Sequence, residues 1–213
     1  MIALDEFLPY VIPDCPGISD AGAIDAIMSA AIEFCEKSLV LQADHDPISV
    51  KTGVIDYDLT APADHLIAKV LKAWYLHRLL PPTAPDDIDD PTVYNVALGS
   101  SGNAPLQFFQ KTARSISLWP VPQSDEDKAV TLRVALKPKR AATSVDDVLY
   151  EDWVDVIAAG AKSALQMTPG KAYGNPIAAK YNDNLFTAGV NRAMTRANKG
   201  NTRANLSVRM RRL

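Results

Sequence analysis

The chain has 213 residues, of which 47% are hydrophobic, 7% aromatic and 22% charged, and its formal net charge is −3. These values are ordinary for a globular protein, and the apolar content is enough for a sizeable core in one domain or in one domain that carries an insertion. No stretch approaches the roughly 18 consecutive apolar residues of a membrane span, and no basic segment followed by an apolar run opens the chain, so we expect neither a membrane helix nor a secretory signal.

The first predicted element is an amphipathic helix that follows the Pro16-Gly17 turn. Ser19 can cap its N-terminus, because a serine oxygen accepts a hydrogen bond from a backbone amide of the first turn. Apolar side chains then recur at helical spacing, at Ala23, Ile24, Ile27, Met28, Ala31, Ile32, Cys35 and Leu39. This spacing predicts a helix of about six turns with one buried face.

A β-rich middle is predicted next. From Ile48 to Leu59 apolar and polar residues alternate in short runs, which is typical of short strands. The same alternation marks Ile116–Leu118 and Val130–Leu136, and the polar stretch Gln123–Lys128 separates these two runs. We therefore predict that the two runs form an antiparallel hairpin with one buried face.

The segment from His65 to Leu80 fits two patterns. A helical stripe would consist of Leu66, Ile67, Val70, Leu71 and Trp74. One face of a strand would consist of Leu66, Ala68, Val70, Trp74 and Leu76. The local pattern alone favours the helix. Pro, Asp, Gly and Ser are abundant between Pro81 and Asn103, which predicts a loop.

The helical period returns from Asp146 to Met167, with acidic residues near the start, where the helix dipole favours negative charge. Thr168-Pro169-Gly170 ends this helix, Pro176 opens another one, and Gly200 stops it. The apolar stripe of the last helix is Ala178, Leu185, Phe186, Val190, Ala193 and Ala197.

These elements predict an α+β fold. It consists of a small helical bundle, made of the N-terminal helix and two C-terminal helices, with an inserted antiparallel β-domain and a basic C-terminal tail. We assign residues 1–43 and 141–200 to the helical bundle, 44–140 to the inserted β-rich domain, and 201–213 to the basic tail.

The basic residues are concentrated at the C-terminus. Seven of the 22 basic residues and none of the 25 acidic residues lie between Val190 and Leu213. They are Arg192, Arg196, Lys199, Arg203, Arg209, Arg211 and Arg212. Such a segment can bind a nucleic acid or a neighbouring acidic subunit, or it can simply be solvated by water. No aromatic residue follows Phe186, so stacking of single-stranded bases is not expected, whereas contact with duplex phosphates needs no aromatic side chain.

No pattern in the sequence points to catalysis, and we predict no enzyme activity, metal or cofactor. His45, His65 and His77 lack the spacing of a zinc site, and Cys15 and Cys35 form neither a disulfide framework nor a nucleophile pair. Gly99–Gly102 lacks the lysine and the helix of a phosphate-binding loop.

Two groups of carboxylates could serve a metal-dependent hydrolase. They are Asp56 with Asp58, and the calcium-like cluster Asp86, Asp87, Asp89 and Asp90. The spacing of a twelve-residue calcium loop is absent, and solvated side chains are the simpler interpretation.

The order and spacing of several segments resemble the head-to-tail adaptor proteins of tailed bacteriophages, of the kind called tail tubular protein A. The segments are the N-terminal amphipathic helix, Val54–Leu59 with Pro62, Ile116–Pro122, Leu132–Pro138, the helix with Glu151, Ile157, Ala158, Gly160 and Ala161, and Asn175-Pro176 with Ala179 and Tyr181. The resemblance implies that residues 65–80 are strands of the β-domain, against their local helical pattern. It assigns no role to Asp86–Pro105.

The resemblance also implies a structural protein of the virion neck. This connector would be a ring, a homododecamer, between the portal protein and a downstream tail or nozzle protein, and double-stranded DNA would pass through its channel during ejection without being read. It implies assembly in the host cytoplasm and no membrane partner. The seven basic side chains would then dock on the portal or on a neighbouring copy. Two alternatives stay open: a DNA-binding protein that uses the basic C-terminus, and another tail-completion or baseplate protein.

Overall fold

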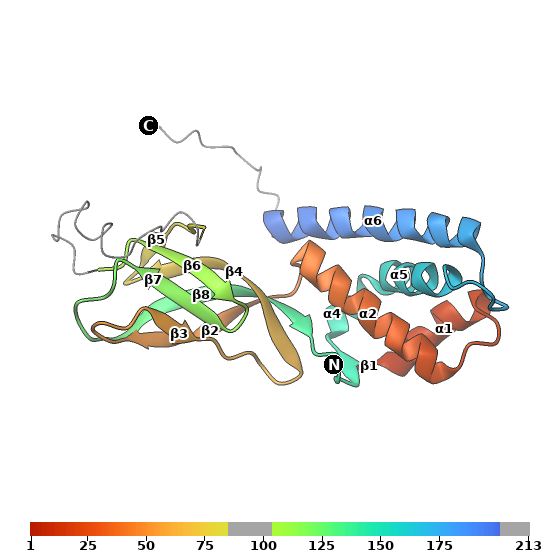
Figure 1. Cartoon of the computed structure of the whole chain (residues 1–213), viewed down its shortest axis with the longest axis horizontal. Helices are drawn as coiled ribbons and strands as arrows, with labels where there is room; N and C mark the ends of the chain where they lie inside the picture. The colour runs from red at the N-terminus through yellow and green to blue at the C-terminus, as the bar shows by residue number, and fades with distance from the viewer. Residues whose placement is uncertain (85–103, 201–213) are drawn as a thin grey trace, which may run out of the picture. The chain divides into compact units, whose positions relative to one another are not determined.

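A computed structural model of the chain describes residues 1–84 and 104–200 (Figure 1). The chain divides into two compact units. The helical unit is Met1–Leu41 with Pro138–Leu213, and the β unit is Gln42–Lys137. The fold contains both helices and antiparallel strand pairs, which confirms the mixed α and β class predicted from the sequence.

All the helices of the described residues lie in the helical unit. Its α-helices are α1 (Leu8–Val11), α2 (Asp20–Ser38), α4 (Asp147–Glu151), α5 (Val154–Gln166) and α6 (Pro176–Lys199). Short 3-10 turns at Leu4–Phe7 and Ile12–Asp14 flank α1. The two-residue strands β1 (Ile2–Ala3) and β9 (Ser144–Val145) pair antiparallel. Helix α5 contacts both α2 and α6, and α2 also contacts α6. In the described residues, no helix is long and apolar enough to cross a membrane.

Helix α2 begins and ends as its sequence predicts. The Ser19 side chain accepts a hydrogen bond from the Gly22 amide at 3.3 Å, which caps the N-terminus. Leu39 follows the helix with a φ of 55°, a left-handed conformation that stops it. Its buried face includes Ile27, Phe34 and Cys35, each without exposed surface.

The helix predicted from Asp146 to Met167 is in fact two helices, α4 and α5. Trp153 lies between them with a φ of −135° and a ψ of 12°, which is not helical and interrupts the hydrogen-bond ladder. Its indole is only 4% exposed and packs on Phe34, with 5.4 Å between the ring centroids. The spacing of the apolar residues does not reveal this break, because the same helical spacing continues on both sides of Trp153.

The β unit contains two sheets. The first has the strand order β2-β8-β4-β5 and consists of β2 (Gln42–Val50), β8 (Glu126–Pro138), β4 (His65–Tyr75) and β5 (Arg78–Leu80). The second has the order β3-β7-β6 and consists of β3 (Asp56–Asp58), β7 (Ser115–Trp119) and β6 (Gln107–Thr112). Their core includes Val50, Leu80, Ile116, Leu118 and Leu132, all at most 1% exposed.

Residues 65–80 form a hairpin, so the helix favoured by their local pattern is wrong and the strands implied by the resemblance are confirmed. Strands β4 and β5 pair antiparallel from Ala73↔Leu80 to Tyr75↔Arg78. The buried residues of β4 are His65, Ile67, Val70, Ala73 and Tyr75. Ile67, Val70 and Ala73 are three residues apart, which is the spacing of one face of a helix although these residues lie in a strand.

The predicted hairpin between the runs around Ile116 and Val130 is also wrong. Strand β7 pairs with β3 and β6, whereas β8 lies between β2 and β4 in the other sheet. Alternation identifies the buried face of a strand but carries no information about which strand is its neighbour. Pro120 and Pro122 follow β7, and neither has an amide hydrogen with which to continue a ladder.

Candidate functional site

Helix α6 carries three of the basic residues singled out in the sequence, and local sequence determines its bounds. The Asn175 side chain accepts a hydrogen bond from the Ala178 amide at 3.2 Å, and Pro176 occupies the first turn, where no amide hydrogen is needed. Gly200 follows the helix with a φ of 66°. The start at Pro176 and the stop at Gly200 confirm the sequence prediction.

One face of α6 is buried against α5 at close range. A Cβ atom added to Gly189 would lie 2.4 Å from a methyl carbon of Val156, and one added to Gly160 of α5 would lie 2.7 Å from the Phe186 ring. Both glycines are therefore required by close packing of α5 and α6, because a side chain at either position would overlap its neighbour.

A second side of α6 exposes large apolar side chains. Ile177, Tyr181 and Leu185, spaced four residues apart, are 85%, 64% and 45% exposed. We call these three residues the α6 apolar row. The prediction that Leu185 belongs to the buried stripe is wrong; that stripe consists of Ala179, Asn182, Phe186, Gly189, Val190 and Ala193. Exposed apolar side chains in a contiguous row are typical of a contact surface.

An apolar groove lies on the other flank of α6. It has a volume of about 240 Å³ and is lined by Lys37 of α2 and by Phe186, Thr187, Val190, Asn191 and Met194 of α6. Leu185 of the apolar row and Thr187 of the groove are separated by roughly 200° around the helix axis, because each residue turns the helix by about 100°. The helix thus presents two different apolar surfaces on its two flanks.

The structure places two of the seven predicted docking residues in an intrachain cluster. The guanidinium groups of Arg192 and Arg196 lie 5.3 and 5.9 Å from the centroid of the Trp153 ring. Arg196 also pairs with Asp152, with 2.8 Å between Nη1 and the carboxylate oxygen. Lys199 is the last residue of α6 and is exposed. Arg203, Arg209, Arg211 and Arg212 lie outside the described residues.

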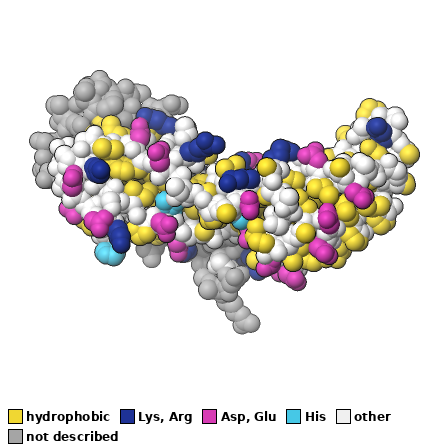
Figure 2. All heavy atoms as spheres, turned by 90° about the horizontal axis from the view of Figure 1, so that it is seen from below, with side chains coloured by type: hydrophobic (Ala, Val, Ile, Leu, Met, Phe, Trp, Pro, Cys, Tyr) yellow, Lys and Arg dark blue, Asp and Glu magenta, His cyan; other side chains and the backbone are white. Residues whose placement is uncertain are grey.

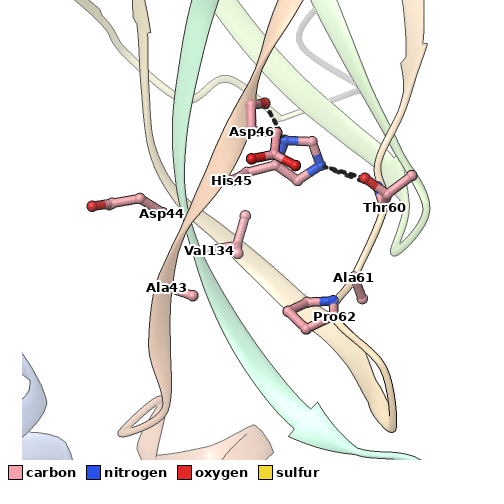
Figure 3. Close-up of a pocket in the computed structure, with 8 residues that line it drawn as sticks. All are labelled: Ala43, Asp44, His45, Asp46, Thr60, Ala61, Pro62 and Val134. Atoms are coloured by element: carbon pink, nitrogen blue, oxygen red, sulfur yellow. Dashed lines mark hydrogen bonds between the residues drawn. The ribbon is translucent and has the colours of Figure 1, made fainter.

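The β unit contains a separate pocket of about 320 Å³ (Figure 3). It is lined by Ala43, Asp44, His45, Asp46, Thr60, Ala61, Pro62 and Val134. The His45 ring bridges its two sides, with Nδ1 2.6 Å from the Asp46 carbonyl oxygen and Nε2 3.0 Å from the Thr60 amide nitrogen. Asp44 forms an ion pair at 3.0 Å with Arg133 of β8.

The other residues considered in the sequence do not come together in a site. His65 is buried with its Nδ1 2.8 Å from the Ala63 carbonyl, and His77 lies in the turn between β4 and β5. Asp56 and Asp58 lie on the exposed face of β3, and Asp56 accepts a hydrogen bond from the Ser117 hydroxyl. Gly99–Gly102 and the cluster Asp86–Asp90 lie outside the described residues.

Within residues 1–84 and 104–200, no three His, Cys, Asp or Glu side chains gather closely enough to hold a metal ion. Cys35 is fully buried, and this burial raises the pKa of its thiol, so that the nucleophilic thiolate is disfavoured. On the face drawn in Figure 2, Asp and Glu side chains are scattered among apolar ones.

Sequence reasoning missed the α6 apolar row and the pocket of the β unit. The four-residue spacing of Ile177, Tyr181 and Leu185 was a usable signal for the row, since it marks one side of a helix. The pocket had no such signal, because Thr60–Pro62 and β2 meet only through the tertiary structure.

A family model described as SU10 adaptor protein matches residues 3–211 of the chain. None of the curated proteins matches it in sequence.

Proposed function

The chain belongs to the SU10 adaptor protein family, and on this basis we propose that it forms the connector ring in the neck of a tailed bacteriophage. An adaptor family is a family of structural phage proteins, so the chain is a structural component of the virion that interacts with other head and tail proteins. The finer proposal is a homododecamer related to tail tubular protein A, with the portal on one side, a tail or nozzle protein on the other, and DNA passing through the channel.

The extent of the family match is the observation that carries this proposal. It runs from residue 3 to residue 211 and so includes both the helical unit and the β unit. A match to one unit alone could reflect a widespread fold, whereas a match over both units relates the whole described chain to an adaptor. We therefore also propose that the adaptor has three parts: the bundle of α2, α5 and α6, the inserted β-domain, and a basic tail at residues 201–213.

The flanks of α6 support contacts between copies. A ring of identical subunits needs two different surfaces on each copy, since each subunit contacts the next one head to tail. The α6 apolar row and the groove beside Met194 are two such surfaces on one helix. Burying Ile177, which is 85% exposed, removes apolar surface from water and so favours association.

The basic C-terminal residues support docking on an acidic partner. Arg192 and Arg196 already contact Trp153, and Arg196 contacts Asp152, so we assign them to holding α6 and assign the docking to Arg203, Arg209, Arg211 and Arg212. Arginine suits this role because its planar guanidinium binds carboxylates with two parallel hydrogen bonds. The acidic majority in the rest of the chain repels the phosphates of DNA, which favours passage over binding.

The test is reconstitution of the chain with the portal protein of the same phage. We expect rings of twelve copies on the portal in electron micrographs, and we expect them to be lost when Arg203, Arg209, Arg211 and Arg212 are replaced by serine. A variant with Arg192→Gln and Arg196→Gln is the matched control and should retain docking. Failure of the wild-type chain to bind the portal, or rings of another symmetry, would contradict the corresponding part of the proposal.

A second test addresses the contact between copies. The triple variant Ile177→Ser, Tyr181→Ser and Leu185→Ser should stay folded but lose ring formation, because only exposed side chains are changed. A control variant with Asn184→Ser and Thr195→Ser changes exposed polar residues of the same helix that belong neither to the apolar row nor to the groove. Rings of the triple variant that are as stable as those of the control would exclude the apolar row as the subunit contact.

A further inference from the structure

Two tyrosine rings, one from α1 and one from α4, meet at the surface of the helical unit. The rings of Tyr10 and Tyr150 lie edge to face, with 6.3 Å between their centroids and 84° between their planes. Tyr150 packs on the buried ring of Phe7 at 5.2 Å, whereas Tyr10 is 39% exposed. We call Tyr10 and Tyr150 the tyrosine pair. The pair is held in place from the core and presents aromatic surface to the outside.

Two exposed carboxylates flank the tyrosine pair. Glu6 lies in the 3-10 turn before α1, and Glu151 is the last residue of α4. The pKa of Tyr150 is raised by its hydrogen bond with Tyr10, by desolvation and by the negative charges of Glu6 and Glu151, so both carboxylates lie near its hydroxyl group. Within residues 1–84 and 104–200, neither carboxylate takes part in an ion pair.

The chain segments around the tyrosine pair are strongly acidic. Residues 1–41 contain seven acidic side chains and a single basic one, Lys37. Residues 141–166 contain five acidic side chains and a single basic one, Lys162. Both lysines are already paired, Lys37 with Glu33 and Lys162 with Asp14. A ligand of the tyrosine pair is therefore a cation, because the surrounding charge repels an anion.

The chain itself shows which cation suits an aromatic ring beside a carboxylate. Arg196 lies over the Trp153 ring, 5.9 Å from its centroid, and pairs with Asp152 at 2.8 Å. Tyr150-Glu151 directly precede Asp152-Trp153, so the same combination of groups occurs twice in four residues. A guanidinium fits it, because its flat face stacks on the ring while its N–H groups bind the carboxylate.

We propose that the tyrosine pair, with Glu6 and Glu151, binds an arginine from the C-terminal segment of a neighbouring copy of the chain. The segment 201–213 contains four basic residues, all of them arginine, and no acidic residue. Fully extended, a chain of this length spans at most about 45 Å, which is enough to reach an adjacent subunit. This inference rests on the proposed ring and names a neighbouring copy as the acidic partner of the basic segment.

The arrangement of the helical unit favours a neighbouring copy as the donor of the arginine. Helix α6, which leads into the C-terminal segment, and helix α1 lie on opposite sides of the helical unit (Figure 1). Both helices pack on α5 and α2. Each copy thus offers a basic segment at one place and its receptor at another. Two different surfaces of this kind are what a closed ring of identical subunits requires.

Binding can be measured without ring formation. The probe is a fluorescent peptide of residues 201–213, titrated into the full chain in which the four arginines of its own segment are replaced by serine. We expect the double variant Glu6→Gln with Glu151→Gln to weaken peptide binding by about tenfold, because hydrogen bonds to charged groups are lost. Tyr10→Leu keeps an apolar side chain but removes the ring, and it should also weaken binding. No binding of the peptide would overturn the proposal.

Two controls separate an arginine site from unspecific attraction. Glu33→Gln with Glu36→Gln removes the same charge from exposed positions of α2 and should leave the affinity for the peptide unchanged. A peptide with lysine in place of each arginine carries the same charge but should bind several times more weakly, because lysine does not stack and bind at once. Equal losses in the two double variants, equal binding of the two peptides, or an unchanged affinity of Tyr10→Leu would each overturn the proposal.

A pair of cysteines identifies the copy that supplies the arginine. A chain with Glu151→Cys and Arg211→Cys, oxidised by air in rings on the portal, should yield covalent multimers in electrophoresis without reductant. The native Cys15 and Cys35 are buried and take no part. Internally linked monomers, or no link at all, would overturn the assignment to a neighbouring copy. Rings without peptide binding would refute this inference alone, whereas peptide binding without rings would refute the proposed connector.

Discussion

Asn182 of α6 donates a hydrogen bond to Gln166 of α5 at 2.9 Å, and both side chains are buried. Gln166 in turn donates to the backbone carbonyl of Asp14 at 3.2 Å. This short chain of bonds joins α6, α5 and the 3-10 turn before α2. Buried polar groups are costly when unpaired, so the chain specifies how these three elements fit together.

Replacing Asn182 by leucine should therefore destabilise the protein. The Gln166 side-chain oxygen would lose its donor in a buried site, which costs about 1–3 kcal/mol. Urea denaturation measures this as a lower transition midpoint. Asn184→Leu, at an exposed position of the same helix, is the control and should change stability by less than about 0.5 kcal/mol. Equal effects of the two substitutions would show that the buried bond contributes nothing.

Gly189→Ala should also lower stability, although alanine is the better helix former. The added methyl group would meet Val156 at 2.4 Å, and forcing extra volume into a packed interface costs about 1–3 kcal/mol. The comparison is Gly22→Ala in α2, where the nearest atom is the Ser19 hydroxyl at 3.2 Å. A melting temperature that rises for both variants would contradict the close packing of α5 and α6.

Single substitutions in the cluster around Trp153 should lower the free energy of unfolding by different amounts. The ion pair of Arg196 with Asp152 is 43% and 38% exposed, so Arg196→Gln should cost less than about 1 kcal/mol. Trp153→Ala removes a buried indole and should cost about 3–5 kcal/mol. Denaturation curves of both variants check this order. If Arg196→Gln unfolded the chain, it could not serve as a control for portal docking.

The contribution of Asp125 to the stability of the protein should depend on pH. The amide and hydroxyl of Thr52 donate to this carboxylate at 2.7 and 2.8 Å and hold its pKa below the ordinary value of 3.8. A lowered folded-state pKa contributes stability above pH 3.8, and this contribution is lost as the pH falls through the lowered value.

Thr52→Val removes the hydroxyl donor and leaves the amide donor in place. The Asp125 pKa should therefore rise part of the way to its ordinary value, as measured by a carboxyl carbon NMR titration. The matched variant Thr112→Val, at another exposed threonine of the β unit, should leave the titration of Asp125 where it was. An unmoved midpoint in Thr52→Val would mean that the hydroxyl does not stabilise the carboxylate.

The elements that were predicted correctly are those whose limits are set by local chemistry. Ser19 and Asn175 cap α2 and α6 with their own side chains, and Gly200 follows α6 with a positive φ. These signals act within a few residues, so the sequence alone determines where the helices begin and end.

The elements that were missed depend on distant residues. The partners of β7 are β3 and β6, and nothing in residues 115–119 identifies them. Leu185 fits an apolar stripe by composition, but the small residues Ala179 and Gly189 and the polar Asn182 take the buried face. The pocket of the β unit likewise depends on distant residues, because it lies between β2, Thr60–Pro62 and Val134 of β8.

The pairing of β1 with β9 sets an order of events during synthesis. Ile2 pairs with Val145, and α2 packs on α5, so β1 and α2 have met both of these partners only when the chain has passed residue 166. At about 5–20 residues per second, this wait is on the order of ten seconds on the ribosome. The β unit is translated in full during that interval and can fold before β1 and α2 meet their partners in the helical unit. An amphipathic α2 left uncovered for so long is the part of the nascent chain on which chaperones should act.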